Sequence, residues 1–191
     1  MPQAARATAT YAELLALPED ARAEVIAGEL LVSPNPNGRH SRAQRSISRH
    51  IGGPFDDDDG RGGPGGWWIL IEIDVQFGPH DIVRPDVVGW LRTRLPDPWD
   101  DLPSTVRPDW ICEVTSPSNA AHDRVVKRVL YARHGVPHYW IVDPRERVLE
   151  CLQLQDGAWL ELGSWGDGDE VRIAPFAEVA LEVSRLFPPI R

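Results

Sequence analysis

The stretch DWICEVTSPSNAAHDRVVKRVLYARHGVPHYWIVDP, Asp109 to Pro144, combines the patterns of a strand, a helix and a second strand. The apolar run WICEV suits a buried strand, and SPSN stops it and offers Ser118 or Asn119 as a helix N-cap. The predicted helix runs to about His134, where Gly135 is a suitable residue just after a helix end. HYWIV is the second buried strand. This spacing predicts a βαβ unit, with two parallel strands and a right-handed crossover.

Further strands are predicted on both sides of this unit. WWILIEIDVQF, residues 67–77, alternates apolar and polar side chains and predicts one strand. Its apolar face would carry Ile69, Ile71, Ile73, Val75 and Phe77. IVRPDVVGWL, residues 82–91, predicts the next strand. Downstream, RVLECLQLQDGAWLELG, residues 147–163, predicts a C-terminal hairpin that turns at Asp156 and Gly157.

The N-terminal part of the chain predicts a short helix, a hairpin and a longer helix. YAELLALPED, residues 11–20, is a short helix that stops at its proline. AEVIAGELLVSPNPNG, residues 23–38, predicts a β-hairpin because Gly28 breaks its apolar run. RHSRAQRSISRHI, residues 39–51, predicts a helix. The following residues 52–66 are rich in Gly and Asp, lack periodicity and predict a mobile loop.

The composition is that of a soluble globular protein. The chain has 191 residues, 42% hydrophobic and 26% charged, which predicts one domain over residues 11–191 after a flexible tail, residues 1–10. No apolar run approaches the ~18 residues needed to cross a membrane. Cys112 and Cys151 lack metal-ligand or disulfide spacing, which predicts strand packing in a reduced, cytoplasmic protein. The net charge of −9 argues against a surface that coats nucleic acid, although a local basic patch is compatible with a nuclease.

Asp86 and Glu113 occupy positions where apolar residues would pack better. Asp86 interrupts IVRPDVVGW, and Glu113 interrupts WICEVT. A buried carboxylate costs several kcal/mol unless it is paired or bound to a metal, and two carboxylates on neighbouring strands repel each other. A divalent cation between them removes this cost. The pair therefore predicts an oxygen-rich Mg²⁺ site, with Mn²⁺ as a substitute, that polarises a phosphodiester and helps to generate hydroxide from water.

Lys127 is the one lysine among 20 basic residues, the other 19 being arginine. A carboxylate–x–lysine nuclease motif would place its lysine two residues after Glu113, but Thr115 stands there, so the amine has to come from elsewhere. On the predicted helix Asp123, Lys127 and Tyr131 are spaced i, i+4 and i+8 and share a face. This spacing lets Lys127 reach the site and position a water. A surface lysine paired with Asp123 is the open alternative, and core packing is the favoured interpretation of Tyr131.

Four segments together resemble one known family. They are AEVIAGELLVSPNPNGRHSRAQRSISRHI, VRPDVVGW, the stretch quoted first and the closing RLF, and the resemblance as a whole covers the chain from about Tyr11 to Phe187. The pattern is similar to the Uma-two family of restriction-endonuclease-like proteins, within the PD-(D/E)XK nuclease superfamily. The resemblance implies a mixed α/β (α+β) restriction-endonuclease-like fold. A central mixed β-sheet would be flanked by helices, with an N-terminal hairpin and a C-terminal hairpin.

The same resemblance implies roles for particular residues. Asp86 and Glu113 would be metal ligands, and Lys127 would be the catalytic lysine, displaced onto the helix. An N-terminal carboxylate often completes such a site; Glu24 matches the family's position best, and Glu29 is the second choice. The residue before Glu24 is usually aromatic in the family and is alanine here. This departure does not touch the other three residues.

A row of arginines marks the helix predicted over residues 39–51. They recur at intervals of three or four residues and therefore share one helix face: Arg39, Arg42, Arg45 and Arg49. One interpretation is contact with DNA phosphates, and the other, slightly favoured by the spacing alone, is an ordinary solvated face. His40 fits a place near the active site as well as a capping or packing role. The run DDDD, residues 56–59, is interpreted as a solvated loop.

These residues predict a Mg²⁺-dependent endonuclease that hydrolyses DNA. Asp86 and Glu113, with Glu24, would hold the metal, while Lys127 would position the attacking water and stabilise charge on the phosphate. Two other functions stay open: a binding or assembly protein that retains the nuclease fold, which the net charge of −9 favours, and a metal-dependent phosphoesterase acting on RNA or nucleotides. Because such nucleases often pair to cut both strands, the resemblance also implies a homodimer.

Overall fold

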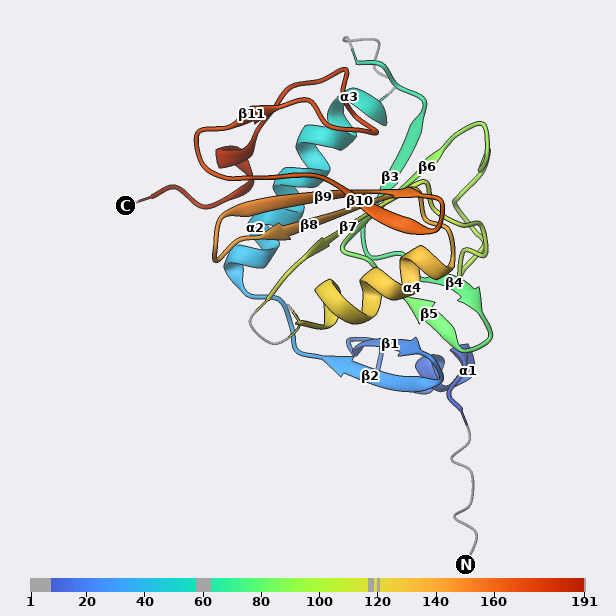
Figure 1. The fold of residues 1–191 in the computed structure, drawn as a ribbon. Coiled ribbons are helices and arrows are strands. Elements are labelled where there is room, and N and C mark those ends of the chain that lie inside the picture. Colours follow the sequence, from blue (N-terminus) through green and yellow to red (C-terminus); the bar gives the residue numbers. More distant parts are fainter. Residues whose placement is uncertain (1–7, 58–62, 117–118, 120, 191) are drawn as a thin grey trace, which may run out of the picture.

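Two β-sheets form the frame of the protein in the computed structural model, which describes residues 8–57, 63–116, 119 and 121–190 (Figure 1). The larger sheet contains β3 (Trp67–Leu70), β6 (Val87–Leu91), β7 (Trp110–Val114), β8 (His138–Asp143), β9 (Val148–Gln155) and β10 (Ala158–Trp165). The smaller sheet contains β1 (Arg22–Ile26), β2 (Glu29–Ser33), β4 (Val75–Gly78) and β5 (Asp81–Val83). Their strand orders are β10-β9-β8-β7-β6-β3 and β2-β1-β5-β4. Two short strands, β11 (Glu170–Val171) and β12 (Leu181–Glu182), pair separately.

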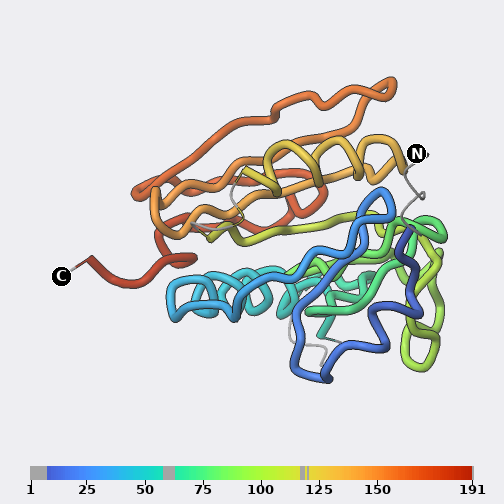
Figure 2. Tube along the Cα trace, turned by 90° about the horizontal axis from the view of Figure 1, so that it is seen from below, coloured from blue at the N-terminus to red at the C-terminus, as the bar shows by residue number. Residues whose placement is uncertain are grey.

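Helices cover both faces of the larger sheet. On one face lie α2 (Gly38–Ile47), the π-helical turn η1 (Ser48–Gly52) and α3 (Gly53–Phe55); on the other lie the π-helical turn η2 (His122–Lys127) and α4 (Arg128–Arg133). The short helices α1 (Tyr11–Leu15) and η3 (Val183–Leu186) lie near the chain ends. Ile47 of α2 shares a buried cluster with Trp110, whereas Leu130 of α4 shares another with Ile111. Figure 2 shows α2 in cyan and α4 in yellow-orange on opposite sides of β7. The predicted mixed sheet flanked by helices is confirmed.

The predicted βαβ unit is present. β7 and β8 pair in parallel, from Trp110 opposite His138 to Val114 opposite Val142. The helical segment between them ends as expected, because Gly135 adopts a φ of +71° that favours glycine. Ser118, one of the two predicted N-caps, lies outside the described residues. The alternation along β7 sends successive side chains to opposite faces of the sheet, which is how one strand serves both hydrophobic clusters.

Both predicted hairpins are confirmed. β1 and β2 pair antiparallel, and their turn contains Gly28 with a φ of +78°. β9 and β10 pair antiparallel around Asp156 and Gly157, whose φ values of +49° and +78° match the turn that a two-residue hairpin requires. These turns are specified locally, by residues that tolerate positive φ, so the sequence alone was enough to place them.

The prediction of one strand over residues 67–77 is wrong. The chain leaves the larger sheet after β3, turns at Glu72 with a φ of +54°, and enters the smaller sheet as β4. Ile71, expected on the buried face, is 52% exposed. The apolar alternation holds on each side of the break, but the positive φ at Glu72 ends the strand and redirects the chain.

The strand predicted over residues 82–91 is divided in the same way. β5 belongs to the smaller sheet and β6 to the larger, with Arg84, Pro85 and Asp86 as the linker. Proline has no N–H for a sheet ladder, which favours a break at this point. The linker therefore passes from one sheet to the other and places Asp86 where they meet.

The predicted loop over residues 52–66 begins too early. Helical structure continues through α3, where Phe55 is 1% exposed and its ring lies 4.7 Å from that of Phe176. This aromatic contact gives the segment buried surface that its Gly-rich composition concealed. Cys112 and Cys151 are buried strand residues with free thiols, as predicted. Within the described ranges, none of the helices has the length and apolar character needed to cross a membrane.

Candidate active site

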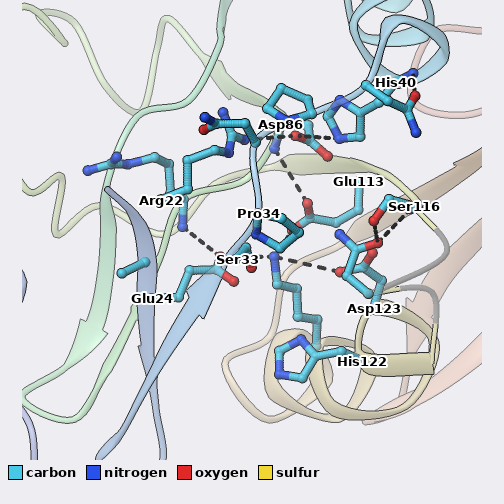
Figure 3. A pocket seen from close by; sticks show the side chains of 17 residues that line it. Arg22, Glu24, Ser33, Pro34, His40, Asp86, Glu113, Ser116, His122 and Asp123 are labelled. Atoms are coloured by element: carbon cyan, nitrogen blue, oxygen red, sulfur yellow. Dashed lines mark hydrogen bonds and ion pairs between the residues drawn. The ribbon is translucent and has the colours of Figure 1, made fainter. Parts of the chain in front are cut away.

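A cavity of about 250 Å³ gathers the polar residues that the sequence singled out (Figure 3). Glu24 lies in β1 of the smaller sheet, Glu113 lies in β7 of the larger sheet, and Asp86 lies in the linker that joins them. Lys127 enters from the last residue of η2. Glu29, the second choice for the N-terminal carboxylate, is exposed at the start of β2. The site is therefore formed where the two sheets meet.

The Lys127 side chain points into this cavity and is 4% exposed. Its Nζ lies 2.9 Å from Oε1 of Glu24 and 3.0 Å from Oε1 of Glu113. A third carboxylate, Asp123, lies one helical turn earlier, with its Oδ1 3.7 Å from the amine. The open alternative of a surface lysine is thus wrong. Asp123 is its neighbour, but both side chains are buried.

Asp86 is held by backbone and side-chain groups together. Its Oδ2 accepts a hydrogen bond of 2.7 Å from the N–H of Val114. Its Oδ1 lies 3.2 Å from Nε2 of His40 and 3.6 Å from Nη2 of Arg22. The Asp86 N–H in turn lies 3.4 Å from Oε2 of Glu113, which links the two acidic residues. Of the roles considered for His40, the structure places it at the site.

Glu113 is the most enclosed of the acidic residues predicted for the site, at 2% exposed. Its Oε1 accepts hydrogen bonds from the hydroxyl of Tyr131, at 2.6 Å, and from Lys127. Tyr131 lies one turn after Lys127, so one face of the η2–α4 segment supplies both donors. The favoured interpretation of Tyr131 as a core residue is incomplete: its ring is fully buried, but its hydroxyl orients Glu113.

Burial and charge act together on the ionisation of this cluster. Burial raises the pKa of Glu113 well above its ordinary value; the Lys127 ammonium opposes this, and the neighbouring carboxylates add to it. Burial also raises the pKa of Asp123, to about 7, again against the effect of Lys127. For Lys127 burial acts in the opposite direction, yet the carboxylates of Glu113, Glu24 and Asp123 raise its pKa well above the ordinary value. The amine is therefore protonated at neutral pH.

Sequence reasoning missed Asp123 and Arg22 as members of the site. Asp123 was placed on the helix face of Lys127 but was given no role at the site, and it was named as a partner of Lys127 only in the surface alternative. Arg22 contacts Glu72 at 2.8 Å as well as Asp86, and no local pattern marks it because Glu72 belongs to the segment predicted as a continuous strand. Its place depends on the meeting of the two sheets.

The composition of the cavity fits an oxygen-coordinated divalent cation. Its carboxylates supply the hard donors that Mg²⁺ prefers, and a bound cation would offset the cost of burying them. Even so, within the part of the chain that the structure describes, no three His, Cys, Asp or Glu side chains already surround one point suited to an ion. The predicted ligand set of Asp86, Glu113 and Glu24 is not preassembled. Instead, the Lys127 amine contacts two of these carboxylates.

The mixed sheet and its flanking helices agree with the restriction-endonuclease-like fold that the sequence pattern implied. Residues 9–184 match the Uma2 family, described as "Putative restriction endonuclease". The chain therefore belongs to the Uma2 family, as its sequence pattern indicated. No curated protein matches the chain.

Comparison with solved structures supports the fold. A crystal structure described as "a putative nuclease belonging to DUF820", from Anabaena variabilis, has a TM-score of 0.74 at 23% sequence identity. The match covers 93% of this chain and 97% of that chain, so the two proteins share one fold over nearly their whole lengths. A cryo-EM structure of a DrdV–DNA complex gives a TM-score of 0.33 at 17% identity, over 68% of this chain and 12% of that chain.

Proposed function

We propose that the protein is a metal-dependent endonuclease that hydrolyses DNA phosphodiester bonds, with Mg²⁺ as its metal and Mn²⁺ as a substitute. One observation carries this proposal: the buried Lys127 amine lies within 3.0 Å of Glu113 and beside Glu24, in a cavity that also holds Asp86. A cavity with this excess of acidic groups is suited to bind a divalent cation, and a bound cation attracts and polarises a phosphate group.

Asp86 and Glu113, with Glu24, would hold the metal, which when bound polarises the phosphodiester and lowers the pKa of water. The contribution of the chain itself comes from Lys127. Burial opposes its charge, but the surrounding carboxylates raise its pKa well above the ordinary value, so it carries its proton at neutral pH. A protonated amine donates hydrogen bonds and accepts none. Lys127 therefore positions the attacking water and stabilises negative charge on the phosphate, rather than removing a proton from water.

The arginine row on α2 and η1 supports a path for the DNA backbone. Arg39, Arg42, Arg45 and Arg49 are all exposed, and none forms an ion pair with a carboxylate of the described residues. The row begins beside the cavity, because His40, the residue after Arg39 on α2, lines it together with the N-cap residue Asn37. Several other arginines are paired with acids, so positive charge on this otherwise acidic protein is left uncompensated along α2.

The variant carrying both Arg42→Gln and Arg45→Gln tests this path. If each arginine neutralises one phosphate, the slope of log binding constant against log salt becomes less steep by about 0.9 per contact on duplex DNA. Binding is measured by fluorescence anisotropy without divalent metal, so that no cleavage occurs. Arg133→Gln is the control, because Arg133 is an exposed arginine of α4 on the opposite face of the sheet, where it pairs with Asp81 at 2.7 Å. Equal slopes for the double variant and the control would contradict the path.

The proposed activity is tested with a substrate panel of single- and double-stranded DNA, RNA and dinucleotides, each with Mg²⁺ or Mn²⁺. We expect cleavage of DNA that EDTA abolishes. Faster hydrolysis of RNA or dinucleotides would favour the phosphoesterase instead. Metal binding that depends on Asp86, without cleavage of any substrate, would favour a binding protein that retains the nuclease fold. The homodimer stays a prediction, and sedimentation analysis of the oligomeric state tests it.

A further inference from the structure

Asp123 is a buried acid that receives no hydrogen bond from the described residues. It is 1% exposed, and both of its carboxylate oxygens are buried without a hydrogen-bond donor. It lines the same cavity as Lys127 and lies four residues before it on η2. A carboxylate buried in this state is costly, so its presence in the cavity calls for a role.

The three carboxylates around the amine are not equivalent. Oε1 of Glu24 also accepts the N–H of Arg84 at 2.8 Å, and Oε1 of Glu113 also accepts the hydroxyl of Tyr131 at 2.6 Å. Both lie at hydrogen-bond distance from the amine. Asp123, at 3.7 Å, is outside that distance and has no other donor among the described groups. Among the three carboxylates, Asp123 is therefore the one whose oxygens are free to accept a hydrogen bond from the amine.

Binding of a divalent cation would change the demands on this cluster. Glu24 and Glu113 are both candidate metal ligands, and in this structure Oε1 of each contacts the Lys127 amine. An ammonium group and a divalent cation on the same oxygens repel each other strongly in a buried site. The amine therefore has to leave these oxygens for the cation to bind well, and it has to stay in the cavity to act on the substrate.

We propose that Asp123 is a positioning residue that receives the Lys127 amine when Glu24 and Glu113 bind the divalent cation. This inference rests on the proposed function. A shift from 3.7 Å to the ~2.8 Å of a charged hydrogen bond is within the reach of a lysine side chain, whose stem is flexible. Because both residues lie on one helical segment at i and i+4, the exchange needs no movement of the backbone. The amine stays beside the metal ligands without occupying them.

The chain offers a direct reporter of this exchange, because Lys127 is its one lysine. Protein labelled with ¹⁵N-lysine gives a single side-chain amine signal. We expect Mg²⁺ to shift this signal in the natural protein, and the Asp123→Asn variant to bind Mg²⁺ about 10- to 100-fold more weakly by calorimetry, as when a metal ligand loses its supporting group. Asp123→Glu, which keeps the carboxylate, should restore much of the affinity. Asp109→Asn is the control, because Asp109 is a buried acid paired with Arg94, outside this cavity.

A double-mutant cycle separates positioning from direct ligation. If Asp123 acts through the amine, Asp123→Asn has little further effect on Mg²⁺ affinity once Lys127 is replaced by Met. An equal loss of affinity in both backgrounds would identify Asp123 as a metal ligand and overturn the inference. Unchanged Mg²⁺ affinity in the Asp123→Asn variant would also overturn the inference, whether or not Mg²⁺ still shifts the amine signal of that variant. These signal measurements do not depend on the folding of the Lys127→Met variant.

The failure of the inference is distinct from the failure of the proposed function. Mg²⁺ binding to the natural protein that is lost in Asp86→Ala supports the metal site itself. If this binding is absent, the proposed function fails and the inference fails with it. If it is present but insensitive to Asp123→Asn, only the positioning role is overturned.

Discussion

Replacing Lys127 by Met should lower the free energy of unfolding by about 3–5 kcal/mol at pH 8, which is the usual cost of removing one partner from a buried ion pair. The amine is the cation that contacts Glu24, Glu113 and Asp123 together, and all four residues line one cavity. Methionine fills much of the same volume, so the loss comes from uncompensated charge and not from a void. Denaturant unfolding, followed by tryptophan fluorescence, measures the change.

The pH dependence of this loss follows from the direction of the pKa shifts. Folding raises the pKa of Asp123 from 3.8 to about 7 and raises that of Glu113 well above 4.5, with burial as the largest cause. Such a group binds its proton more tightly in the folded state, so its contribution to stability is present at low pH and is lost as the pH rises through the folded value. Without the amine these pKa values rise further. The difference in the free energy of unfolding between the Lys127→Met variant and the natural protein should therefore become smaller from pH 8 to pH 5.

Arg128→Met provides the control for the Lys127 variant. Arg128 is the next residue on the same helical segment, is only partly buried, and makes no ion pair with the residues that the structure describes. Its replacement should change the free energy of unfolding by less than about 1 kcal/mol. Mg²⁺ should stabilise Lys127→Met, because the cation replaces the missing positive charge. Equal losses for both variants, or a loss at position 127 that does not vary with pH, would show that the cluster is not held by its charge.

Asp86→Asn should reduce kcat/KM for DNA cleavage by at least about 10³-fold, since a catalytic metal contributes several kcal/mol to the transition state. Asparagine is nearly isosteric with aspartate, and its side-chain oxygen retains the ability to accept the N–H of Val114. The fold should therefore be kept while the charge that would attract the proposed metal is lost. Initial rates at several Mg²⁺ concentrations, with circular dichroism as the check on folding, measure both effects.

Asp109→Asn is the matched control for Asp86→Asn. Asp109 is also a buried aspartate that accepts a backbone N–H, from Leu91 at 2.9 Å, and lies beside an arginine, Arg94. If both variants lose activity equally, the effect at Asp86 is structural and the assignment of a metal ligand there is wrong. Unchanged activity in Asp109→Asn with loss in Asp86→Asn supports the assignment.

The parts of the fold that could be predicted are those decided within a short segment. Gly28, Gly135 and Gly157 mark turns or helix ends through their tolerance of positive φ, and the apolar runs around Glu113 mark buried strands. The fate of residues 67–77 could not be predicted in this way. The same alternation describes one long strand and two strands in separate sheets, and the difference depends on the backbone at Glu72.

The candidate site was predictable only in outline. Asp86 and Glu113 stand out as acids within apolar runs, and Lys127 stands out in a chain that otherwise uses arginine. Asp123 did not stand out, because an acid four residues before a lysine is the usual pattern of a solvent-exposed helix pair. Its burial comes from the tertiary packing around η2, where Lys127 contacts Glu24 of β1, about a hundred residues earlier in the chain.

The enclosure of Lys127 also has a use at the bench. Reagents that acylate primary amines require an accessible, unprotonated nitrogen. Lys127 meets neither requirement, because its side chain is 4% exposed and its amine is bound by carboxylates. Acylation of Lys127 would occur only during excursions in which η2 separates from its neighbours. The rate of that modification, followed by mass spectrometry, would therefore report how often the interior of the cavity opens to solvent.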